Sequence, residues 1–576
     1  MRYIDQLDAL TFDVTGFPAR YKIEAWEELL SGHPDTTVPV WTCNGLRNGF
    51  KIGRDDTVPS PVYRNLPCND DQWLAVSQWV ISHHGEGKLA GPYDSAPSSD
   101  YFWSPIGAVP KKVDHNTGDV LKWRIIHHLS KGKISVNSGI PDEYARCTYL
   151  SVRQLVKFIY LLGPGAWVWK YDLKNAYRQF PIHPSDVHYL GIKWEGKFYF
   201  DKALPMGLKS ACGLFTRLGD AMQYCTWKRS PESFYVSNDV VLALIHYIDD
   251  FAGGAQCMQY DKAVNQFIVF KETMGILGVD LSLVKFLWPA QLIELLGIYF
   301  NTKQRTLALP EHKILDVERK INTIMPKRRA SYKELKSLQG SLQWCCNPIW
   351  VGSAFMQNLN NELRGLNPRH YGEVNKELKA DLDWWKFALR NLNALPMKYF
   401  LMSELRFDTE FQLYTDACPR GIGAFIEGTG MYFQLAIPAK WYEVFHINVL
   451  ELMVPVIALI VWGEYFHHKT VSIWIDNMTA QFQLIKKHAS NKCEQRMLAI
   501  ICATAVKYQC YFWTERIDTK LNTVADALSR NWSLAKIKSN FGTTLVKRVN
   551  VENVFELLCV TKSFKELCNG LKFCVL

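Results

Sequence analysis

The two adjacent carboxylates in Tyr247-Ile248-Asp249-Asp250 are the residues whose types and spacing most directly suggest chemistry. A third aspartate, Asp172, closes the apolar run Trp167-Val168-Trp169-Lys170-Tyr171. Two carboxylates at the tip of a hairpin and one from another strand can hold a pair of Mg²⁺ ions, with Mn²⁺ as a possible substitute. Such a pair stabilises both the attacking and the leaving oxygen of an in-line phosphoryl transfer. Because a tetrapeptide of this kind also arises by chance, the surrounding sequence has to support the prediction.

Three other kinds of segment surround these aspartates in an order that suits phosphoryl transfer. Residues 204–210 form a glycine-containing turn that leads into an expected helix. Residues 109–112 and 122–124 are basic and would form the two arms of a hairpin, which could neutralise a triphosphate. Lys285 and residues 295–298 follow downstream. Basic pairs are most often solvated surface, so the shared order of the segments carries more weight than any one of them.

A second set of carboxylates lies beyond residue 400. Its members are Asp416, Glu451, Asp476 and Asp526. Three of the four lie within or at the end of strongly apolar segments, where an unpaired carboxylate is costly to bury. Such positions indicate metal ligation or a hidden partner. The alternative for any one of them is ordinary helix capping or salt bridging.

Length and composition indicate a globular protein with several domains. At 576 residues the chain is long for one core and predicts three or four domains. A hydrophobic content of 48% and a charged content of 21% exclude a disordered chain. The net charge of +10 has the sign expected of a protein that binds a phosphate backbone, although many proteins with this charge do not.

Cysteine usage and hydropathy predict an intracellular protein, in the cytoplasm or the nucleus, and no membrane association. The fifteen Cys form no CxxC pair, so no zinc ribbon or zinc knuckle can be assembled from them. No signal peptide is recognisable at Met1. Residues 449–462 are apolar but too few to span a bilayer, and we expect a buried helix. Pro455 is awkward within such a helix unless it lies in the first turn.

Periodicity and turn signals predict an α+β multidomain fold with strands at residues 167–171 and 240–248. The predicted segments are an N-terminal region of unknown role at 1–95, an α+β domain at 96–300, a helical and basic region at 301–404, a second α+β unit at 405–532 and a basic tail at 533–576.

Residues 170–181, 204–210 and 246–251 resemble the palm motifs of retroelement reverse transcriptases. The resemblance implies a right-hand polymerase, with fingers and palm at 96–300 and a thumb or connection at 301–404. It implies that Asp172, Asp249 and Asp250 are metal ligands, assisted by the Leu173 carbonyl.

The same resemblance implies roles for five residues around the nucleotide. Tyr177 matches the aromatic gate that excludes a ribose 2′-OH, and Lys111 and Arg124 match fingers residues that bind the incoming triphosphate. Met206 stands where retroviral enzymes carry Gln, which puts sugar contacts there in doubt. Lys285 resembles the lysine thought to protonate pyrophosphate.

The four later carboxylates resemble the two-metal site of a ribonuclease H-like α/β domain. The implied chemistry is hydrolysis of an RNA phosphodiester by a metal-activated water. His488 is the only histidine between Asp476 and Asp526, and its neighbours do not resemble a catalytic histidine loop.

Several segments resemble the DIRS-like group of tyrosine-recombinase retrotransposons more closely. They are residues 45–50, 123–130 and 338–344, whereas residues 522–530 are shared with gypsy-type elements. The implied substrates are RNA or DNA template-primer, RNA–DNA hybrid and dNTPs. The sequence shows no aspartic-protease or integrase motif, so integration would need a separate recombinase or integrase polypeptide.

Two alternatives stay open at the level of the sequence. One is a degenerate or domesticated copy that binds nucleic acid without catalysis, which the seven intact acidic positions disfavour. The other is a DNA-dependent polymerase, which the attached nuclease set disfavours because a hybrid needs its RNA strand removed.

Overall fold

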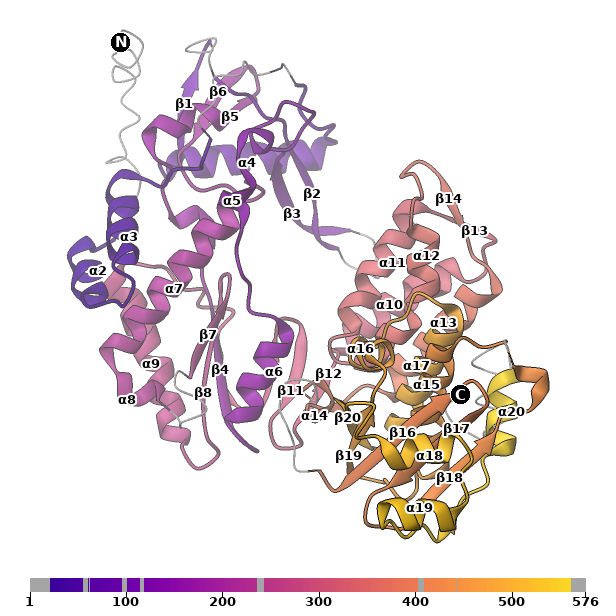
Figure 1. The fold of residues 1–576 in the computed structure, drawn as a ribbon. Coiled ribbons are helices and arrows are strands. Elements are labelled where there is room, and N and C mark those ends of the chain that lie inside the picture. Colours follow the sequence, from indigo (N-terminus) through magenta and orange to yellow (C-terminus); the bar gives the residue numbers. More distant parts are fainter. Residues whose placement is uncertain are drawn as a thin grey trace. The chain divides into compact units, whose positions relative to one another are not determined.

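The protein is described by a computed structural model that covers residues 21–54, 61, 63–95, 101–113, 119–235, 243–401, 409–442 and 444–560. The chain divides into two compact units, Met1–Ile293 and Glu294–Leu576 (Figure 1). Each unit is described by itself.

A four-stranded antiparallel sheet, in the order β7-β8-β4-β9, forms the centre of the first unit. Its strands are β4 (Trp167–Asp172), β7 (Leu244–Tyr247), β8 (Asp250–Ala255) and β9 (Leu287–Ala290). Helices α7 (Ala211–Arg229) and α9 (Tyr260–Leu277) pack against this sheet. Tyr171 of β4 stacks with Phe267 and Phe270 of α9, and Trp169 meets the same two rings edge-on or tilted, so aromatic packing anchors the strand that ends at Asp172. The strand predicted at 167–171 is confirmed, and the strand predicted at 240–248 is present at 244–247.

Two smaller sheets complete the first unit. One has the order β1-β6-β5, with β1 (Leu89–Tyr93), β5 (Gly191–Trp194) and β6 (Lys197–Asp201), and α4 (Asp70–Gly85) contacts it. The other is the hairpin of β2 (Ile106–Val113) and β3 (Val120–His127), in which Val109 pairs with Arg124. The basic hairpin predicted from the sequence is therefore present. Two further helices are α5 (Asp142–Ala145) and α6 (Val152–Leu161), and a short helix, α8 (Pro231–Phe234), follows α7.

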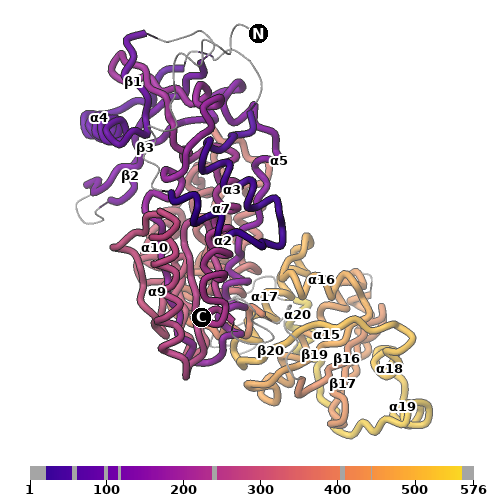
Figure 2. Tube along the Cα trace, turned by 90° about the vertical axis from the view of Figure 1, so that its left-hand side faces the viewer, coloured from indigo at the N-terminus to yellow at the C-terminus, as the bar shows by residue number. Residues whose placement is uncertain are grey.

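The N-terminal residues from 21 onward are part of this unit. Helices α2 (Ile23–Leu30) and α3 (Thr37–Asn48) pack against α7, which Figure 2 shows from the side. Trp26 is fully buried and its indole Nε1 donates to the Leu277 carbonyl at the end of α9, at 2.9 Å. A buried indole with a satisfied N–H fixes the helix pair to the domain.

The second unit begins with helices and short strands. The helices are α10 (Glu311–Ile324), α11 (Tyr332–Cys345), α12 (Gln357–Leu363), α13 (Lys376–Asn391) and α14 (Lys398–Leu401). The strands are β10 (Leu292–Leu295), β11 (Ile298–Asn301), β12 (Thr306–Ala308) and β15 (Leu395–Pro396) in one sheet, and β13 (Arg329–Ser331) with β14 (Tyr371–Glu373) in a hairpin. The predicted helical character of this region is confirmed, although the sequence analysis did not resolve the short strands within it.

A six-stranded mixed sheet, in the order β20-β19-β16-β17-β18-β21, forms the rest of the second unit. Its strands are β16 (Phe411–Cys418), β17 (Gly421–Ile426), β18 (Met431–Ala436), β19 (Thr470–Ile475), β20 (Tyr511–Arg516) and β21 (Lys547–Arg548). Its helices are α15 (Ile447–Val461), α16 (Met478–Lys486), α17 (Lys492–Lys507), α18 (Thr523–Ser529), α19 (Leu534–Phe541) and α20 (Glu552–Val560). Because β21 pairs with β18, part of the predicted tail adds a strand to the sheet. The α+β multidomain class predicted from the sequence is confirmed.

The buried helix predicted at 449–462 is confirmed as α15. Pro455, which we expected such a helix to accept only in its first turn, does not lie there. Pro455 lies inside the helix, and the helix continues through it to Val461. A proline there cannot donate to the carbonyl four residues earlier, which belongs to Glu451. Nearly all of this helix is buried, so tertiary packing offsets the missing hydrogen bond.

Among the described residues, none of the helices combines the length and the apolar character that crossing a bilayer requires.

Asp381 of α13 offers a test of packing in the second unit. Burial raises the pKa of its carboxyl to about 7, although the Asn358 side chain donates to it at 2.9 Å and opposes the shift. A carboxyl with a raised pKa in the folded state stabilises the protein at low pH, and this contribution is lost as the pH rises through about 7. We expect the melting temperature of Asp381→Asn to rise relative to that of wild type as the pH increases from mildly acidic to mildly alkaline. Scanning calorimetry measures the melting temperatures. The exposed control Asp383→Asn should differ from wild type by the same amount at every pH, and such a pH-independent difference in Asp381→Asn would contradict the prediction.

Candidate active sites

The first carboxylate centre is built by three strands of the first unit. Asp172 ends β4 and pairs in register with Asp250, the first residue of β8. A two-residue turn joins β7 to β8, and its first residue, Ile248, has a φ of +54°. The Leu173 N–H donates to the Asp249 carbonyl at 3.1 Å, which ties the turn to the end of β4. The structure thus brings together the three aspartates that the sequence analysis singled out.

Two lysines form ion pairs with carboxylates of this centre. Lys285 Nζ is 2.8 Å from Asp172 Oδ2, and Lys170 Nζ is 2.8 Å from Asp250 Oδ1. Burial raises the pKa of both Asp249 and Asp250, and the Asp250 charge raises the pKa of Asp249 further. The hydrogen bond to Asp172 raises the pKa of Lys285 and keeps it protonated. A group of partly buried carboxylates that attracts ammonium groups fits the binding of divalent cations.

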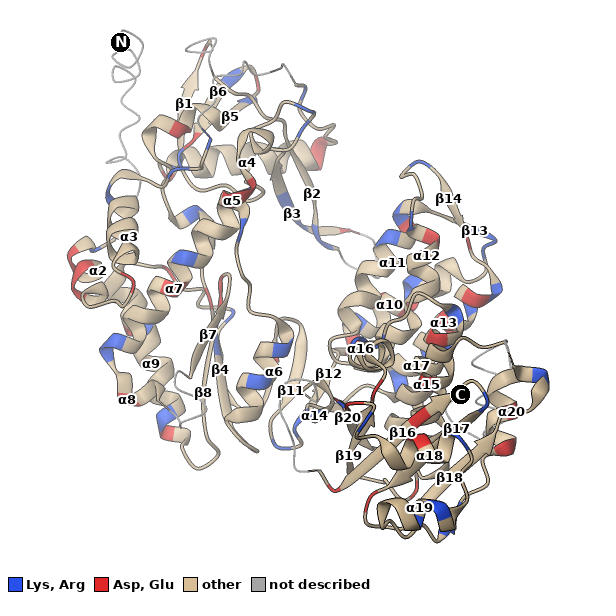
Figure 3. Ribbon diagram, in the orientation of Figure 1, with Lys and Arg blue, Asp and Glu red and all other residues tan. Residues whose placement is uncertain are grey.

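The basic hairpin lies within electrostatic reach of this centre. Burial lowers the pKa of Lys111, and repulsion from Lys122, Arg124 and Lys285 lowers it further, while Asp172 opposes the shift. Figure 3 marks Lys and Arg positions in blue on the β2–β3 hairpin. The structure therefore places both predicted triphosphate-binding residues on the β2–β3 hairpin, with Lys111 coupled to Asp172 and Lys285.

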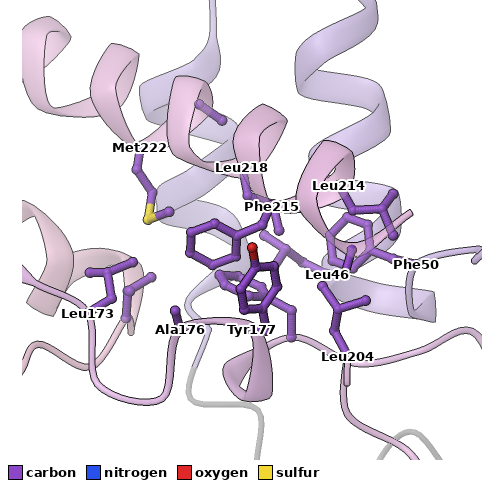
Figure 4. Packing of buried hydrophobic residues seen from close by; sticks show 14 of the residues in the cluster. Leu46, Phe50, Leu173, Ala176, Tyr177, Leu204, Leu214, Phe215, Leu218 and Met222 are labelled. Atoms are coloured by element: carbon purple, nitrogen blue, oxygen red, sulfur yellow. The ribbon is translucent and has the colours of Figure 1, made fainter. Parts of the chain in front are cut away.

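Tyr177 lies in the hydrophobic core of the first unit (Figure 4), within electrostatic reach of Asp249. Its ring packs on Phe215 of α7 with 4.8 Å between centroids, and its hydroxyl lies 3.3 Å from Cys212 Sγ. Burial raises the pKa of the phenol, and the charge of Asp249 raises it further. Only 8% of the residue is exposed, so the edge of the ring that could meet a sugar is small.

Met206 is 59% exposed on the turn that precedes α7, and Asn137 holds this turn in place. The Asn137 side chain donates to the Gly207 carbonyl and accepts from the Lys209 N–H, each at 2.8 Å. Sequence reasoning missed Asn137, because nothing in its local sequence distinguishes it from other turn asparagines.

The second carboxylate centre is tighter than the first. Strands β16 and β19 are parallel, with Tyr414 opposite Trp474, so Asp416 and Asp476 meet at the same end of the sheet. Glu451 projects from α15, and one oxygen of each of the three carboxylates lies within 4.8 Å of the others. Among the residues that the structure describes, no other trio of potential ligands is gathered this closely. The three aspartates of the first centre are not gathered this closely.

The electrostatics of the second centre fit a divalent cation. Burial raises the pKa of Glu451 to about 9, and the charges of Asp416 and Asp476 add to the shift. Burial likewise raises the pKa of Asp416 to about 7. Glu451 Oε2 is buried and has no hydrogen-bond partner among the described residues. Such an orphaned carboxylate oxygen is costly unless a cation or a proton satisfies it.

Asp526 lies on α18, outside the tight trio but coupled to it. Its charge raises the pKa of Asp416, which places it in electrostatic reach. Both of its oxygens accept from Arg530 Nε, at 2.8 and 2.9 Å. The sequence analysis missed the role of Arg530 as the partner of Asp526, although a spacing of four residues on a helix could have suggested it. His488 lies exposed in the loop after α16, and no role is assigned to it.

Comparisons with known proteins give remote relatives. No family model matches the chain. The chain is 24% identical over 447 residues to the retrovirus-related Pol polyprotein from transposon opus of Drosophila melanogaster, a match that covers 75% of this chain and 40% of that protein. It is 24% identical over 257 residues to the genome polyprotein of Petunia vein clearing virus, covering 44% of this chain and 10% of that protein. The chain thus spans less than half the length of either relative.

Solved structures of foamy viral protease-reverse transcriptase are also similar. The complex with dsDNA has a TM-score of 0.47 at 16% identity and covers 86% of this chain and 97% of that chain. The complex with RNA/DNA hybrid has a TM-score of 0.46 at 15% identity and covers 86% of this chain and 63% of that chain. The predicted relation to retroelement proteins is supported by the relatives in sequence, whereas the DIRS-like subgroup stays a prediction.

Glu451 provides a direct test of cation binding at the second centre. Without divalent cations, its raised pKa means that its contribution to stability is lost as the pH rises through about 9. We expect Glu451→Gln to melt at a higher temperature than wild type at alkaline pH in EDTA, because an amide cannot ionise. Added Mg²⁺ should then raise the melting temperature of wild type more than that of the variant. Cation binding by Glu451 would be contradicted if Mg²⁺ raised the melting temperatures of wild type and Glu451→Gln equally. It would also be contradicted if the exposed control Glu464→Gln showed the same shifts as Glu451→Gln.

Proposed function

We propose that this chain is an RNA-directed DNA polymerase with ribonuclease H activity, which copies retrotransposon RNA into DNA and degrades the RNA strand of the hybrid. The observation that carries the proposal is the presence of two separate carboxylate centres in one chain, each electrostatically suited to divalent cations. The similarity to a retrotransposon Pol polyprotein supports it.

In the polymerase reaction, Asp172, Asp249 and Asp250 would hold two Mg²⁺ ions, with help from the Leu173 carbonyl. Bound there, the ions would stabilise the attacking and leaving oxygens of nucleotide transfer. Because Lys170 and Lys285 pair with Asp250 and Asp172, they must give way when the ions bind.

The surrounding side chains would bind and orient the dNTP. Lys111 and Arg124 on the β2–β3 hairpin bind the triphosphate, where their charge offsets the charge that develops during transfer. Lys285, once displaced from Asp172 by the ions, would carry a proton that pyrophosphate can take as it leaves. Tyr177 would exclude a ribose 2′-OH, and Met206 is exposed on the turn before α7, where its apolar side chain puts sugar contacts in doubt.

In the nuclease reaction, Asp416, Glu451, Asp476 and Asp526 would hold the second pair of ions, which activate a water against the RNA phosphodiester. The orphaned Oε2 of Glu451 is ready to accept a cation without losing another partner. Asp526 would have to leave Arg530 to bind an ion, which would free the guanidinium to pair with a phosphate.

The proposal also includes a subgroup, a cellular location and a partner polypeptide. The chain belongs to the DIRS-like group, acts within the cytoplasm or the nucleus, and depends on a separate recombinase or integrase for integration. The segments at residues 45–50, 123–130 and 338–344 support the subgroup. A domesticated copy without catalysis is the rival, and an inactive wild-type protein with normal hybrid binding would favour it.

The independence of the two centres can be tested on one labelled RNA–DNA substrate scored for extension and cleavage together. Asp249→Asn removes a ligand of the first centre, so we expect dNTP incorporation to fall by at least about a hundredfold while hybrid cleavage continues. Asp476→Asn removes a ligand of the second centre, so we expect hybrid cleavage to fall while dNTP incorporation continues. The exposed residues Asp261 and Asp383 provide matched Asp→Asn controls, one in each unit. If Asp249→Asn extends at the wild-type rate, or if either variant loses both activities while folded by circular dichroism, the assignment of two centres is wrong.

Sugar selection tests the position of Tyr177. A small side chain there should admit a 2′-OH, so we expect Tyr177→Ala to raise the ratio of ribonucleotide to deoxyribonucleotide kcat/KM by about tenfold or more. Tyr224→Ala on the same unit serves as a control for loss of a tyrosine. An unchanged ratio in Tyr177→Ala would assign the residue to core packing alone.

A further inference from the structure

The second unit contains a cavity of about 540 Å³ on the side of the six-stranded sheet that α18 covers. Helix α18 contacts β16, β17 and β18, and Figure 1 shows it lying across them. Tyr414 of β16 and Phe425 of β17 line the cavity from the sheet, and their rings stack with 5.0 Å between centroids. None of the three carboxylates of the second centre lines this cavity. Its volume is typical of a small-molecule site.

The segment that follows α19 closes the cavity. Residues 543–545 line it. The Val546 and Lys547 N–H groups donate to the Gly430 carbonyl, at 2.9 and 3.0 Å, and hold this segment on the β17–β18 turn. A Cβ on Gly430 would lie 2.9 Å from Val546 Cγ2, so a larger residue there would push the segment away. The cavity therefore depends on the part of the chain beyond α18.

Asn522 contributes an oxygen that accepts no hydrogen bond from the described residues. The residue is 2% exposed, lines the cavity and stands at the start of α18. Its Nδ2 donates to the Thr415 carbonyl at 3.0 Å. Because a carbonyl accepts only from a donor, this bond fixes which end of the amide is the nitrogen. Oδ1, at the other end, is buried and without a partner in the described part of the chain. A buried acceptor of this kind is costly unless a donor reaches it.

The carboxylate of Glu427 is a second acceptor of the cavity. Burial raises the pKa of Tyr414, and the charge of Glu427 raises it further, so the carboxylate lies within electrostatic reach of the phenol. The Glu427 carboxylate forms no ion pair or hydrogen bond with any described residue. The cavity thus offers two acceptors from different elements, the start of α18 and the end of β17, that are open to a ligand.

The rest of the lining adds no positive charge. Among the described residues that form its wall there is no lysine, arginine or histidine. Lys520 and Lys547 are near in the sequence, but both are exposed and neither belongs to the wall. Three threonine hydroxyls line the cavity, and each can donate or accept. The remaining large side chains are apolar: Ile426, Ile517, Leu521, Val524 and Leu545.

We infer that this cavity binds an amphipathic cation, a guanidinium or ammonium group carried on an apolar stem. An anion would meet the Glu427 carboxylate and no compensating cation, which excludes it. A guanidinium suits the cavity best, because its planar set of five donors can reach acceptors on different elements and because it packs on aromatic rings. Asn522 Oδ1 and the Glu427 carboxylate accept from the cation, and the apolar walls contact the stem. The source is a free amine or the Arg or Lys side chain of a partner polypeptide.

The experiment titrates three probes into the full chain by isothermal titration calorimetry, with Mg²⁺ present. The probes are butylguanidinium, its neutral isostere butylurea, and acetyl-arginine methylamide. We expect butylguanidinium to bind one-to-one and to raise the melting temperature, and butylurea to bind at least about tenfold more weakly. Glu427→Gln keeps the shape of the side chain but removes its charge, and should weaken butylguanidinium binding by about tenfold. Glu464→Gln, at an exposed glutamate outside the cavity, is the control and should bind as wild type does.

A second variant tests the place of binding without removing either acceptor. Thr544 lines the cavity and is exposed, so Thr544→Trp puts a large ring into the space. We expect this variant to lose butylguanidinium binding while its circular dichroism spectrum stays that of wild type. The third probe identifies the source of the cation. Tighter binding of acetyl-arginine methylamide than of butylguanidinium indicates a polypeptide, because the threonine hydroxyls can bond its amides, and equal or weaker binding indicates a free amine.

Four results would overturn the inference. Wild type that binds no butylguanidinium would leave a water-filled cavity only. Equal affinity for butylguanidinium and butylurea would show that the charge is not recognised. Wild-type affinity in folded Glu427→Gln or folded Thr544→Trp would place the probe elsewhere. Binding that is lost in Asp476→Asn but kept in Glu427→Gln would assign the probe to the second carboxylate centre. None of these measurements uses polymerase or nuclease activity, so the proposed function is tested separately.

Discussion

Repulsion between carboxylates that are kept close together and partly out of water is the interaction on which the rest of this structure depends. At the second centre it acts among Asp416, Glu451 and Asp476, where burial first and this repulsion second raise the pKa of Glu451 to about 9. At the first centre Lys170 and Lys285 relieve part of it. Only protons, ammonium groups or metal ions can relieve such repulsion, so each centre is built to take up positive charge. Raised carboxyl pKa values such as these mark candidate functional sites.

The backbone holds the carboxylates against this repulsion. In the first unit, the register of β4 and β8 and the bond from the Leu173 N–H to the Asp249 carbonyl fix the aspartates. In the second, parallel pairing of β16 and β19 brings two aspartates to one edge, and the buried helix α15 supplies the glutamate. That helix continues through Pro455 because it is packed on nearly all sides. Strands and helices therefore carry the acidic groups, and Lys170 and Lys285 pair with two of them.

Much of the candidate sites could be predicted because acidic residues at the ends of apolar runs are a strong local signal. Asp172 after its strand and Glu451 within its helix both follow from this rule. What could not be predicted depends on contacts between distant segments. Asn137 clamps a turn seventy residues away, and α3 docks on residues 181–183; neither leaves a periodic pattern in the sequence. The ion pairs of the first centre, Lys170 with Asp250 and Lys285 with Asp172, likewise join segments far apart in the sequence and leave no local signal.

The central claim is that two separate centres bind divalent cations. Anomalous scattering from crystals of the full chain soaked in Mn²⁺ tests it most directly, because Mn²⁺ can replace Mg²⁺ and is visible at its absorption edge. The account predicts peaks between Asp172, Asp249 and Asp250 and between Asp416, Glu451 and Asp476, with Lys170 and Lys285 displaced from their partners. Lysines that stay paired and carboxylate centres without Mn²⁺ would contradict it.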